Sequence, residues 1–313
     1  MAALEHNLST MTTALPGGRL RPHVKAHKCT ALARQQAAAG HRTFTCATIR
    51  EVEGMAAAGL GDDLLLANEV VDARRLGRLK ARVTVAVDSD QTIAAAVAGG
   101  VREVLIDVNI GLPRCGCPPD HAGRLAAAAR SQGLVVRGVM GYEGHVVGLE
   151  DRATRVRLTE EAMQLLLAAH AQVGGDLISA GGTGTYDCNV WANEIQAGSY
   201  LLMDTAYAKL GLPFRQALSV LATVISVSRG YAVADCGLKS LGMDHGNPAI
   251  AAAQVLFCSD EHVTFVAEEP VKVGERIRVW PAHIDPTVAY HERMHLVAGE
   301  AIVDTLLVDL RGW

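Results

Sequence analysis

Short runs of β-branched and other apolar residues alternate, along the first two thirds of the chain, with alanine-rich segments of helical periodicity. There are eight such runs, each separated from the next by enough residues for a crossover helix. They lie at residues 21–25, 43–46, 63–67, 83–87, 104–109, 135–140, 177–180 and 200–204. This pattern predicts an α/β fold, a (β/α)8 barrel of the TIM type, in which the loops after the strands form the active face.

The segments between the runs predict the outer helices of this barrel. Residues 49–58 and 160–170, for example, carry Ala, Leu and Met at helical spacing, with charged residues between them. We therefore expect the methionines of these segments to belong to the hydrophobic core.

The pattern of apolar and polar residues changes near residue 217. Valine-rich runs at residues 220–227, 263–266, 276–280 and 301–308 are broken by Gly, Pro and Asp, and only residues 248–254 have a helical pattern. We therefore expect a barrel domain over residues 1–216 and a second, mostly β domain over residues 217–313.

Composition limits the classes of partner. The 313 residues carry a formal charge of −4 without a run of Lys or Arg, and no apolar stretch approaches the length of a membrane span. These features argue against nucleic acid and membrane and favour small molecules as partners. The N-terminus lacks a basic region followed by an apolar one, so we expect a cytoplasmic protein.

Seven cysteines, an odd number spread over both halves, indicate reduced thiols rather than a disulfide framework. Cys115 and Cys117 have the spacing of half a metal site. Because no second Cys/His pair matches it, we interpret this segment as a loop with buried thiols.

The most informative residue is Lys25, at the end of the first predicted strand. Period-two alternation directs the polar side chains of this segment to the interior of the barrel, namely Arg21, His23, Lys25 and His27. An amine that is crowded by cations and partly desolvated retains more free base near neutral pH, and it can then attack an aldehyde such as that of pyridoxal 5'-phosphate (PLP). Taken alone, such a cluster is more often a basic strand end on the surface, so the interpretation depends on the motifs that follow.

Two glycine-containing segments flank the last predicted strands. Residues 179–185 follow the seventh strand, where glycines let backbone N–H groups approach an anion and Thr183 adds a hydroxyl. Residues 196–199 precede the eighth strand. The loops after strands seven and eight usually hold the phosphate in such barrels, so we predict a phosphate site here in place of a simple tight turn.

Arg114 and Tyr142 follow the fifth and sixth predicted strands. A guanidinium at this position is suited to pair with the phenolate oxygen of PLP, and the tyrosine is suited to pack against the cofactor ring. A surface salt bridge and a core tyrosine are the alternatives.

Five segments, at residues 21–28, 141–145, 179–185, 194–200 and 281–288, together resemble the alanine-racemase-type fold of PLP enzymes, and within it the D-threonine aldolase and D-serine dehydratase branch. The resemblance extends over nearly the whole chain. It implies that Lys25 is the Schiff-base lysine, that Arg114 faces the PLP phenolate and that Gln196 faces the pyridine nitrogen. It also implies a set of residues that hold the phosphate, namely Gly182, Thr183, Gly198 and Ser199.

The segment at residues 281–287 contains a second candidate site. His283 and Asp285 are two apart, so on an extended segment they project to one face, and an imidazole with a carboxylate suits a divalent ion with open water positions. The resemblance places a metal at this motif. The dehydratases of the branch usually have cysteine where Asp285 stands, whereas its D-threonine and D-3-hydroxyaspartate aldolases have aspartate. The harder oxygen ligand favours Mg²⁺ or Mn²⁺ over Zn²⁺.

The resemblance therefore implies a PLP- and divalent-metal-dependent aldolase (a lyase) that cleaves D-β-hydroxy-α-amino acids to glycine and an aldehyde. The alternatives are a dehydratase that releases ammonia, an amino-acid racemase and a non-catalytic PLP carrier. It also implies a homodimer with shared sites. Family members usually have a strand before the segment that corresponds to residues 4–11, so we expect either an upstream start or a second domain without that strand.

Residues 291–295 match the H-E-x-x-H pattern of zinc proteases. That motif functions only on a helix, and here it lies between a proline-containing segment and a β run. We therefore expect no protease site, although His291 and His295 follow the predicted metal segment closely enough to lie near it.

Overall fold

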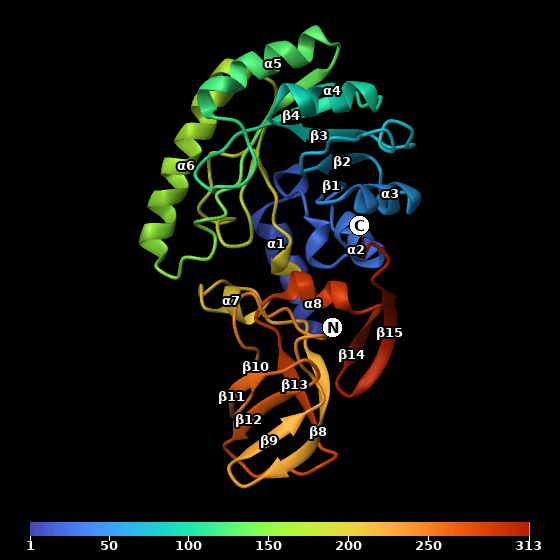
Figure 1. Ribbon diagram of the computed structural model, residues 1–313, viewed down its shortest axis with the longest axis vertical. Coiled ribbons are helices and arrows are strands. Elements are labelled where there is room, and N and C mark those ends of the chain that lie inside the picture. Colours follow the sequence, from blue (N-terminus) through green and yellow to red (C-terminus); the bar gives the residue numbers. More distant parts are fainter. Residues whose placement is uncertain (313) are drawn as a thin grey trace. The chain divides into compact units, whose positions relative to one another are not determined.

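The computed structural model describes residues 1–312 and contains two compact units, each built from two stretches of the chain (Figure 1). The parallel-sheet unit contains Leu8–Gly198 and the chain from Asp309 onward. The β unit contains Met1–Asn7 and Ser199–Val308. The limits 1–216 and 217–313 for the two domains stay a prediction.

Seven parallel strands in chain order form the core of the parallel-sheet unit. The strands are β1 (Thr43–Cys46), β2 (Asp63–Leu66), β3 (Val83–Val87), β4 (Glu103–Asp107), β5 (Val135–Met140), β6 (Leu177–Ala180) and β7 (Glu194–Ile195). The first six coincide with predicted runs. Most of their residues are buried, as expected for a parallel sheet that helices cover on the outside.

A segment that is not a regular strand takes the eighth position in this sheet. Leu20 bridges Ile195 of β7, and His23 bridges Thr45 of β1, both in the parallel sense. The two ends of the sheet are thereby joined through the segment that leads to Lys25, which gives the (β/α)8-type architecture that the sequence predicts.

The first and last predicted strands are wrong in detail. Residues 21–25 include Pro22, which has no backbone N–H to donate, and they continue into the 3-10 turn η2 (Val24–Ala26). Residues 200–204 overlap the 3-10 turn η4 (Ser199–Leu201), and the final strand β7 lies upstream of it. A short buried apolar run has no periodicity that would distinguish these conformations.

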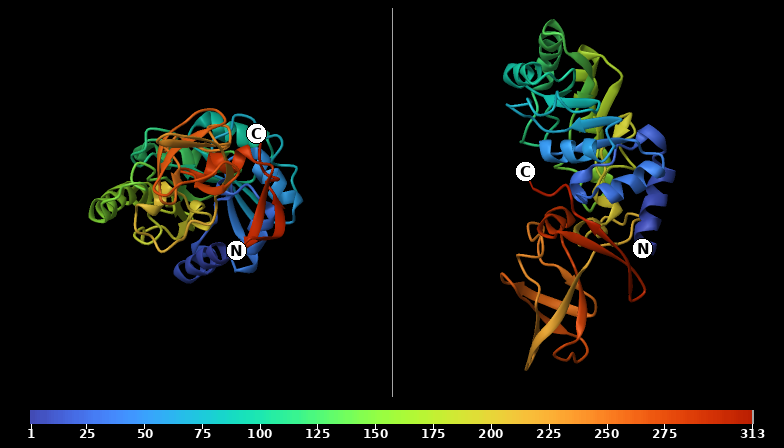
Figure 2. Two further views of the ribbon diagram at one scale, coloured as in Figure 1. Left: turned by 90° about the horizontal axis from the view of Figure 1, so that it is seen from below. Right: turned by 90° about the vertical axis from the view of Figure 1, so that its right-hand side faces the viewer.

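Helices lie on the outside of the curled sheet in Figure 1 and in the right-hand view of Figure 2. They are α2 (Thr30–Ala38), α3 (Ile49–Ala57), α4 (Asp90–Ala98), α5 (Ala122–Ser131) and α6 (Arg152–Val173), with the 3-10 turns η1 (Gly17–Arg19) and η3 (Pro119–His121). The predicted helices at residues 49–58 and 160–170 correspond to α3 and to part of α6. Met55 and Met163 are both 0% exposed, so their assignment to the core is confirmed.

The β unit contains a closed antiparallel barrel of six strands and a separate hairpin. The barrel strands are β8 (Val220–Ser228), β9 (Tyr231–Ala234), β10 (Ala249–Ile250), β11 (Ala253–Cys258), β12 (Val263–Ala267) and β13 (Arg276–Trp280), and the hairpin strands are β14 (Arg293–Ala298) and β15 (Ala301–Leu307). Val224, Phe265 and Val279 belong to the core of the barrel. The helices α7 (Thr205–Ala208) and α8 (Ile284–Tyr290) complete the unit, and α1 (Ala2–Ala14) contributes its first residues.

The predicted helix at residues 248–254 is wrong. This segment forms β10 and the start of β11, joined by a turn in which Ala252 has a positive φ of 51°. Alanine favours helices, but the backbone groups of these residues pair with β12 and β13 in the closed barrel, and that pairing overrides the local propensity.

The first residues of the chain belong to the β unit, and the last residues belong to the parallel-sheet unit. Asn7 is fully buried in the β unit, where its side chain donates to Leu201 O at 3.0 Å and accepts from Arg215 N at 2.7 Å. In the parallel-sheet unit, the carboxylate of Asp309 accepts from Thr30 N at 2.9 Å and so caps the first turn of α2.

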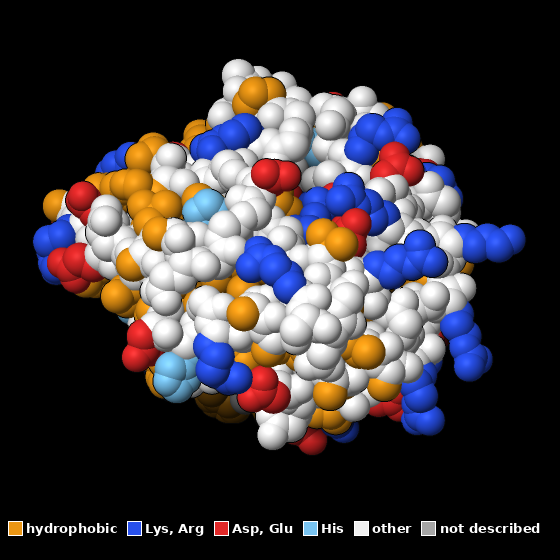
Figure 3. Space-filling model, turned by 90° about the horizontal axis from the view of Figure 1, so that it is seen from above, with side chains coloured by type: hydrophobic (Ala, Val, Ile, Leu, Met, Phe, Trp, Pro, Cys, Tyr) orange, Lys and Arg blue, Asp and Glu red, His pale blue; other side chains and the backbone are white. Residues whose placement is uncertain are grey.

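Three compositional expectations concern the thiols, the membrane and the surface charge within residues 1–312. No disulfide links the cysteines in this range. In the loop that contains Cys115 and Cys117, Cys117 is buried but Cys115 is exposed, so the expectation of two buried thiols is wrong for Cys115. No helix in this range is both long and apolar enough to cross a membrane. On the face drawn in Figure 3, basic side chains are interspersed with acidic and neutral ones.

Candidate active site

Lys25 lies on the single 3-10 turn η2, directly after the segment that bridges β7 and β1. The turn is held by bonds from His27 N and Lys28 N to Val24 O, at 3.1 and 2.7 Å. The lysine is half-buried, whereas Val24 and Ala26 on either side of it are fully buried. The prediction that Lys25 follows a regular strand is therefore wrong, but its position at the carboxyl end of this part of the sheet is as expected.

The surroundings of Lys25 are electropositive. Burial, followed by the nearby charges of Lys25, Lys28 and His27, holds the pKa of His23 well below its usual range. Lys28 forms an ion pair with the fully buried Glu51. Such a cluster of cations suits an anionic ligand.

A network of buried charged side chains lies inside the curled sheet, near the amino ends of the strands. Arg21 lies 2.8 Å from Glu194 and 3.2 Å from Asp63, and Arg137 lies 2.7 Å from Asp63. Burial alone would raise the pKa of Asp63, but hydrogen bonds from Arg137 and the charge of Arg21 lower it to about 2. The inward direction of Arg21 that the sequence predicts is confirmed.

The network continues to Gln196, at the carboxyl end of β7. Ser179 Oγ donates to Glu194 Oε1 at 2.6 Å, and Gln196 Nε2 donates to Ser179 Oγ at 2.9 Å. A carboxylate only accepts hydrogen bonds, so the Ser179 hydrogen is committed to Glu194 and the hydroxyl oxygen accepts from Gln196. This arrangement fixes the orientation of the Gln196 amide.

Glu143, which the sequence analysis did not select, organises the glycine-rich loop after β6. Its carboxylate is 0% exposed and accepts from Gly181 N at 3.1 Å, from Thr185 Oγ1 at 2.9 Å and from Asn189 Nδ2 at 2.9 Å. Three donors satisfy this buried charge. The loop that contains Gly182 and the buried Thr183 is therefore held by a fixed internal anion.

Two further predicted residues meet beside this loop. The Arg114 guanidinium lies 5.3 Å from the centroid of the Tyr142 ring, a cation–π arrangement. A Cβ placed on Gly182 would lie 3.5 Å from the Tyr142 ring, so the tyrosine also lies against the glycine-rich loop. The structure thus brings together Arg114, Tyr142 and Gly182.

Gly198, three residues after β7, allows the chain to pass close to the turn that carries Lys25. A Cβ at Gly198 would lie 2.5 Å from His23 O and 3.1 Å from Ala26 Cβ, which no ordinary side chain permits. The prediction groups Gly198 with Ser199, but the two residues fall in different units, and Ser199 Oγ lies 3.4 Å from Asp285 Oδ1 within the β unit.

The prediction that the segment around His283 and Asp285 is extended is wrong. His283 is the N-cap of α8 with extended backbone angles, and Asp285 lies in the first helical turn. The N-terminal amide of α8 at Ile284 donates to the buried Asp204 at 3.2 Å. Burial raises the pKa of Asp204, although the helix amides and His283 oppose this shift.

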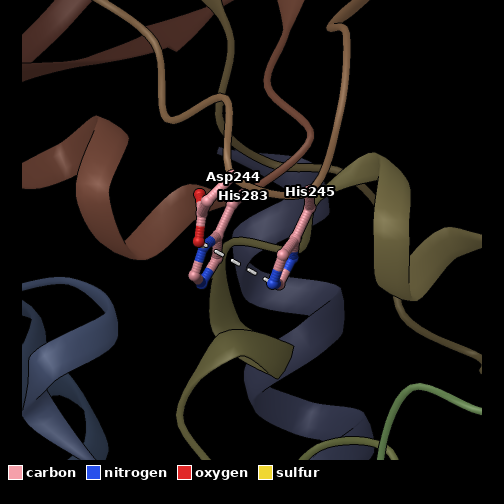
Figure 4. Close-up of side chains that lie close together, drawn as sticks. All are labelled: Asp244, His245 and His283. Carbon is pink, nitrogen blue, oxygen red and sulfur yellow. Dashed lines mark hydrogen bonds and ion pairs between the residues drawn. The ribbon is translucent and has the colours of Figure 1, made fainter.

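His283 lies in a cluster with two residues that the sequence analysis did not select, Asp244 and His245 (Figure 4). His283 Nδ1 and Asp244 Oδ2 are 2.7 Å apart, and His245 Nε2 is 3.8 Å from the same oxygen. Their ligand atoms lie within 4.8 Å of one another, a spacing compatible with a metal ion. Burial would raise the pKa of Asp244, but its hydrogen bond with His283 holds it below its usual range.

Gly242 allows the loop that contains Asp244 and His245 to approach the start of α8. It forms an antiparallel bridge with His283, and its N–H donates to Thr287 Oγ1 at 2.8 Å. A Cβ at this position would lie 2.3 Å from Pro286 Cγ, so only glycine allows the approach. In the sequence, the signal for this contact is a glycine shortly before an adjacent Asp-His pair, which is too common a pattern to identify a site alone.

The H-E-x-x-H segment is not helical, which agrees with the expectation that it is no protease site. His291 is the C-cap of α8 and bonds to Ser240 O at 2.9 Å, while His295 is on β14 and bonds to Thr305 Oγ1 at 2.9 Å. Neither histidine belongs to the cluster of Asp244, His245 and His283.

A curled parallel sheet with a lysine on the turn that closes it, followed by a separate β unit, defines the alanine racemase class of barrel proteins. Residues 1–206 match the family model of the alanine racemase N-terminal domain, and residues 217–297 match that of a putative serine dehydratase domain. The chain belongs to this alanine racemase-like family, in the branch with a serine dehydratase-type second domain.

The similar proteins include aldolases and a dehydratase, the D-threo-3-hydroxyaspartate dehydratase of a Delftia species, which is 30% identical over 78% of this chain and 71% of the relative. The chain is 32% identical to a D-threonine aldolase of an Arthrobacter species, over 94% of this chain and 86% of the relative. It is 31% identical to a 3-hydroxy-D-aspartate aldolase of Paracoccus denitrificans, over 93% of this chain and 84% of the relative. The crystal structure of D-threonine aldolase from Filomicrobium marinum superposes with a TM-score of 0.93 at 34% identity, covering 99% of this chain and 93% of that one, which confirms the predicted fold class.

Proposed function

We propose that this protein is a PLP- and divalent-metal-dependent aldolase that cleaves D-β-hydroxy-α-amino acids to glycine and an aldehyde. The observation that carries the proposal is the position of His283 and Asp285 at the start of α8, with the carboxylates of Asp204 and Asp244 beside them, in a chain similar to proteins named D-threonine aldolase and 3-hydroxy-D-aspartate aldolase.

The residues of the parallel-sheet unit fit PLP. Lys25 would hold the cofactor covalently, and the cations around His23 favour its phosphate dianion. The glycine-rich loop that Glu143 organises provides the close backbone approach that a phosphate requires, with Gly182 and Thr183 as proposed phosphate residues. Gly198 and Ser199 are the other two proposed phosphate residues, and Ser199 belongs to the β unit.

The remaining contacts with the cofactor would come from three side chains. Arg114 would pair with the phenolate oxygen, Tyr142 would pack beside the ring, and Gln196 would face the pyridine nitrogen. The orientation of the Gln196 amide, fixed through Ser179, leaves its carbonyl oxygen for this contact. When bound, PLP accepts the electrons of the substrate bond that is broken.

The donors of the β unit fit a divalent cation. His283 and Asp285 would hold it, and carboxylate oxygen with imidazole nitrogen favours Mg²⁺ or Mn²⁺ over Zn²⁺. When bound, such a cation lowers the pKa of a coordinated hydroxyl group. Asp204, Asp244 and Asp285 surround His283 with negative charge, which attracts a cation to this position.

The contribution of the protein to the reaction is orientation. With cofactor and cation bound, Lys25 and the pair His283 and Asp285 would orient the substrate through its amine and its hydroxyl, so that the Cα–Cβ bond is held in one orientation. The same donors would support elimination of the hydroxyl. Asp285, in place of the cysteine typical of the dehydratases in this branch, favours aldol cleavage.

We also propose a cytoplasmic homodimer that acts on small-molecule amino acids. The acidic net charge and the absence of a basic run support small molecules over nucleic acid as partners. A separate β unit argues against a single-barrel PLP carrier.

The purified protein, loaded with PLP and Mn²⁺, is incubated separately with D-threonine, D-3-hydroxyaspartate and D-serine, with L-threonine as the stereochemical control. We expect glycine and an aldehyde from at least one of the first two substrates and no turnover of L-threonine. Release of ammonia and a 2-oxo acid as the main products would replace the aldolase assignment by that of a dehydratase.

A further inference from the structure

We infer that Asp244 positions His283 so that its Nε2 atom binds the cation, and that His245 supports the His283 ring without binding the same ion. This inference rests on the proposed cation site of the aldolase and assigns roles to two residues that the sequence analysis did not select.

The hydrogen bond between Asp244 and His283 determines the tautomer of the histidine. Asp244 Oδ2 lies 2.7 Å from His283 Nδ1, and a carboxylate only accepts hydrogen bonds, so the ring hydrogen resides on Nδ1. In the neutral imidazole, the lone pair is then on Nε2. A carboxylate on the far nitrogen also makes a histidine a more basic metal ligand and fixes its orientation.

The arrangement of the two imidazole rings excludes a shared ion. The His245 and His283 rings are stacked, with their centroids 4.0 Å apart and their planes inclined by only 8°. A metal lies close to the plane of each imidazole that binds it, at about 2 Å from the nitrogen. Two nearly parallel planes at this separation share no position that a metal ion could occupy. His245 therefore packs against the His283 ring and limits its tilting.

The backbone fixes Asp244 although its side chain is 56% exposed. The bridge between Gly242 and His283 anchors the loop two residues before Asp244, and Thr287 Oγ1 ties both ends by accepting from Gly242 N and donating to His283 O at 2.7 Å. The carboxylate therefore approaches the ring from a supported loop rather than from a free one.

The test measures Mn²⁺ affinity of the PLP-loaded protein by titration, with free Mn²⁺ followed by electron paramagnetic resonance, so that the readout does not depend on turnover. Asp244→Ala is expected to weaken the affinity by about 10- to 100-fold, the range typical of partners that orient a metal-binding histidine. Asp244→Asn keeps an oxygen that accepts from Nδ1, so it is expected to lose less affinity than Asp244→Ala.

His245→Phe is the matched variant for the second residue, because it keeps a stacking ring without a ligand nitrogen. We expect its Mn²⁺ affinity to equal that of the unmodified protein. An affinity loss as large as that of Asp244→Ala would make His245 a ligand and overturn its assigned role. Equal losses in Asp244→Ala and Asp244→Asn would make Asp244 a direct ligand, and no loss in either would overturn the positioning role.

His283→Ala separates failure of this inference from failure of the proposed function. If His283→Ala abolishes Mn²⁺ binding while the Asp244 variants do not weaken it, only the inference fails. If His283→Ala binds Mn²⁺ normally, the proposed cation site itself is wrong. Thermal unfolding of each variant verifies that the proteins compared are folded.

Discussion

Lys25 and Lys28 are three positions apart, yet their surroundings give them different roles. Lys28 is ion-paired with the buried Glu51, whereas Lys25 is on the turn that lies close to Gly198, in the segment after β7. Borohydride reduction of the PLP-loaded protein, followed by peptide mapping, should therefore place the cofactor on Lys25. Lys28→Arg keeps a cation for Glu51 and should retain PLP absorbance, while Lys25→Arg should lose it. Recovery of the cofactor on Lys28 would contradict the assignment.

Asp285 should affect catalysis without affecting the cofactor, because it is not among the residues proposed to hold PLP. We expect Asp285→Asn to lower carbon–carbon cleavage by about 100-fold or more, the order of magnitude expected when a metal ligand is lost, with an unchanged PLP spectrum. A chelator added to the unmodified protein should reproduce the effect. Glu292→Gln, in the H-E-x-x-H segment, is the control and should retain activity. An equal loss of activity in this variant would show that the H-E-x-x-H segment takes part in the reaction.

At the scale of elements, the buried charges at the amino ends of the strands join β2, β5 and β7. The pKa of Asp63 is lowered to about 2 from an ordinary value of 3.8, so the folded state holds the ionised form more strongly than the unfolded chain does. This contribution, about 2 kcal/mol, is fully present above pH 4 and is lost as the pH falls toward 2. Asp63→Asn should therefore reduce the slope of unfolding free energy against pH in this window, measured by urea titration. An unchanged slope would show that Asp63 is not the group responsible.

The first turn of α2 depends on a residue far away in the sequence. Cys29, at the N-cap, makes no side-chain capping bond, and Asp309 provides the acceptor for Thr30 N. Asp309→Ala should lower the free energy of unfolding by about 1 kcal/mol, the usual loss for a helix cap. Glu300→Ala, at an exposed turn, is the matched control and should have little effect on the thermal unfolding midpoint.

The sequence predicts elements well where one local signal determines them. The runs at residues 135–140 and 177–180 coincide with β5 and β6, since continuous β-branched residues between helical segments suit buried parallel strands. Residues 248–254 are predicted wrongly because strand pairing, which is not local, determines their conformation. The candidate site follows the same rule: Lys25 and His283 have local motifs, whereas Asp244 is recognisable only through its contact with a histidine on another segment.

For the whole molecule, the resemblance to the alanine racemase-type family implies a two-fold dimer in which each site draws residues from both chains. Mixing Lys25→Ala and Asp285→Ala proteins, after dissociation and reassociation, should restore part of the activity that each lacks alone. Mixing Lys25→Ala with a Lys25→Ala, Asp285→Ala double variant is the control and should restore none. Absence of complementation in stable mixed dimers would place both residues of a site in one chain.

The exchange of chain ends between the units has a consequence for how the protein is made. A ribosome delivers the parallel-sheet residues first, and domains generally fold as they emerge. Here α2 remains uncapped until Asp309 has been synthesised, and Asn7 waits for its partners at Leu201 and Arg215. Each unit therefore gains one of its stabilising contacts only after most of the chain has been synthesised, and we expect the nascent parallel-sheet unit to be less stable than the finished one.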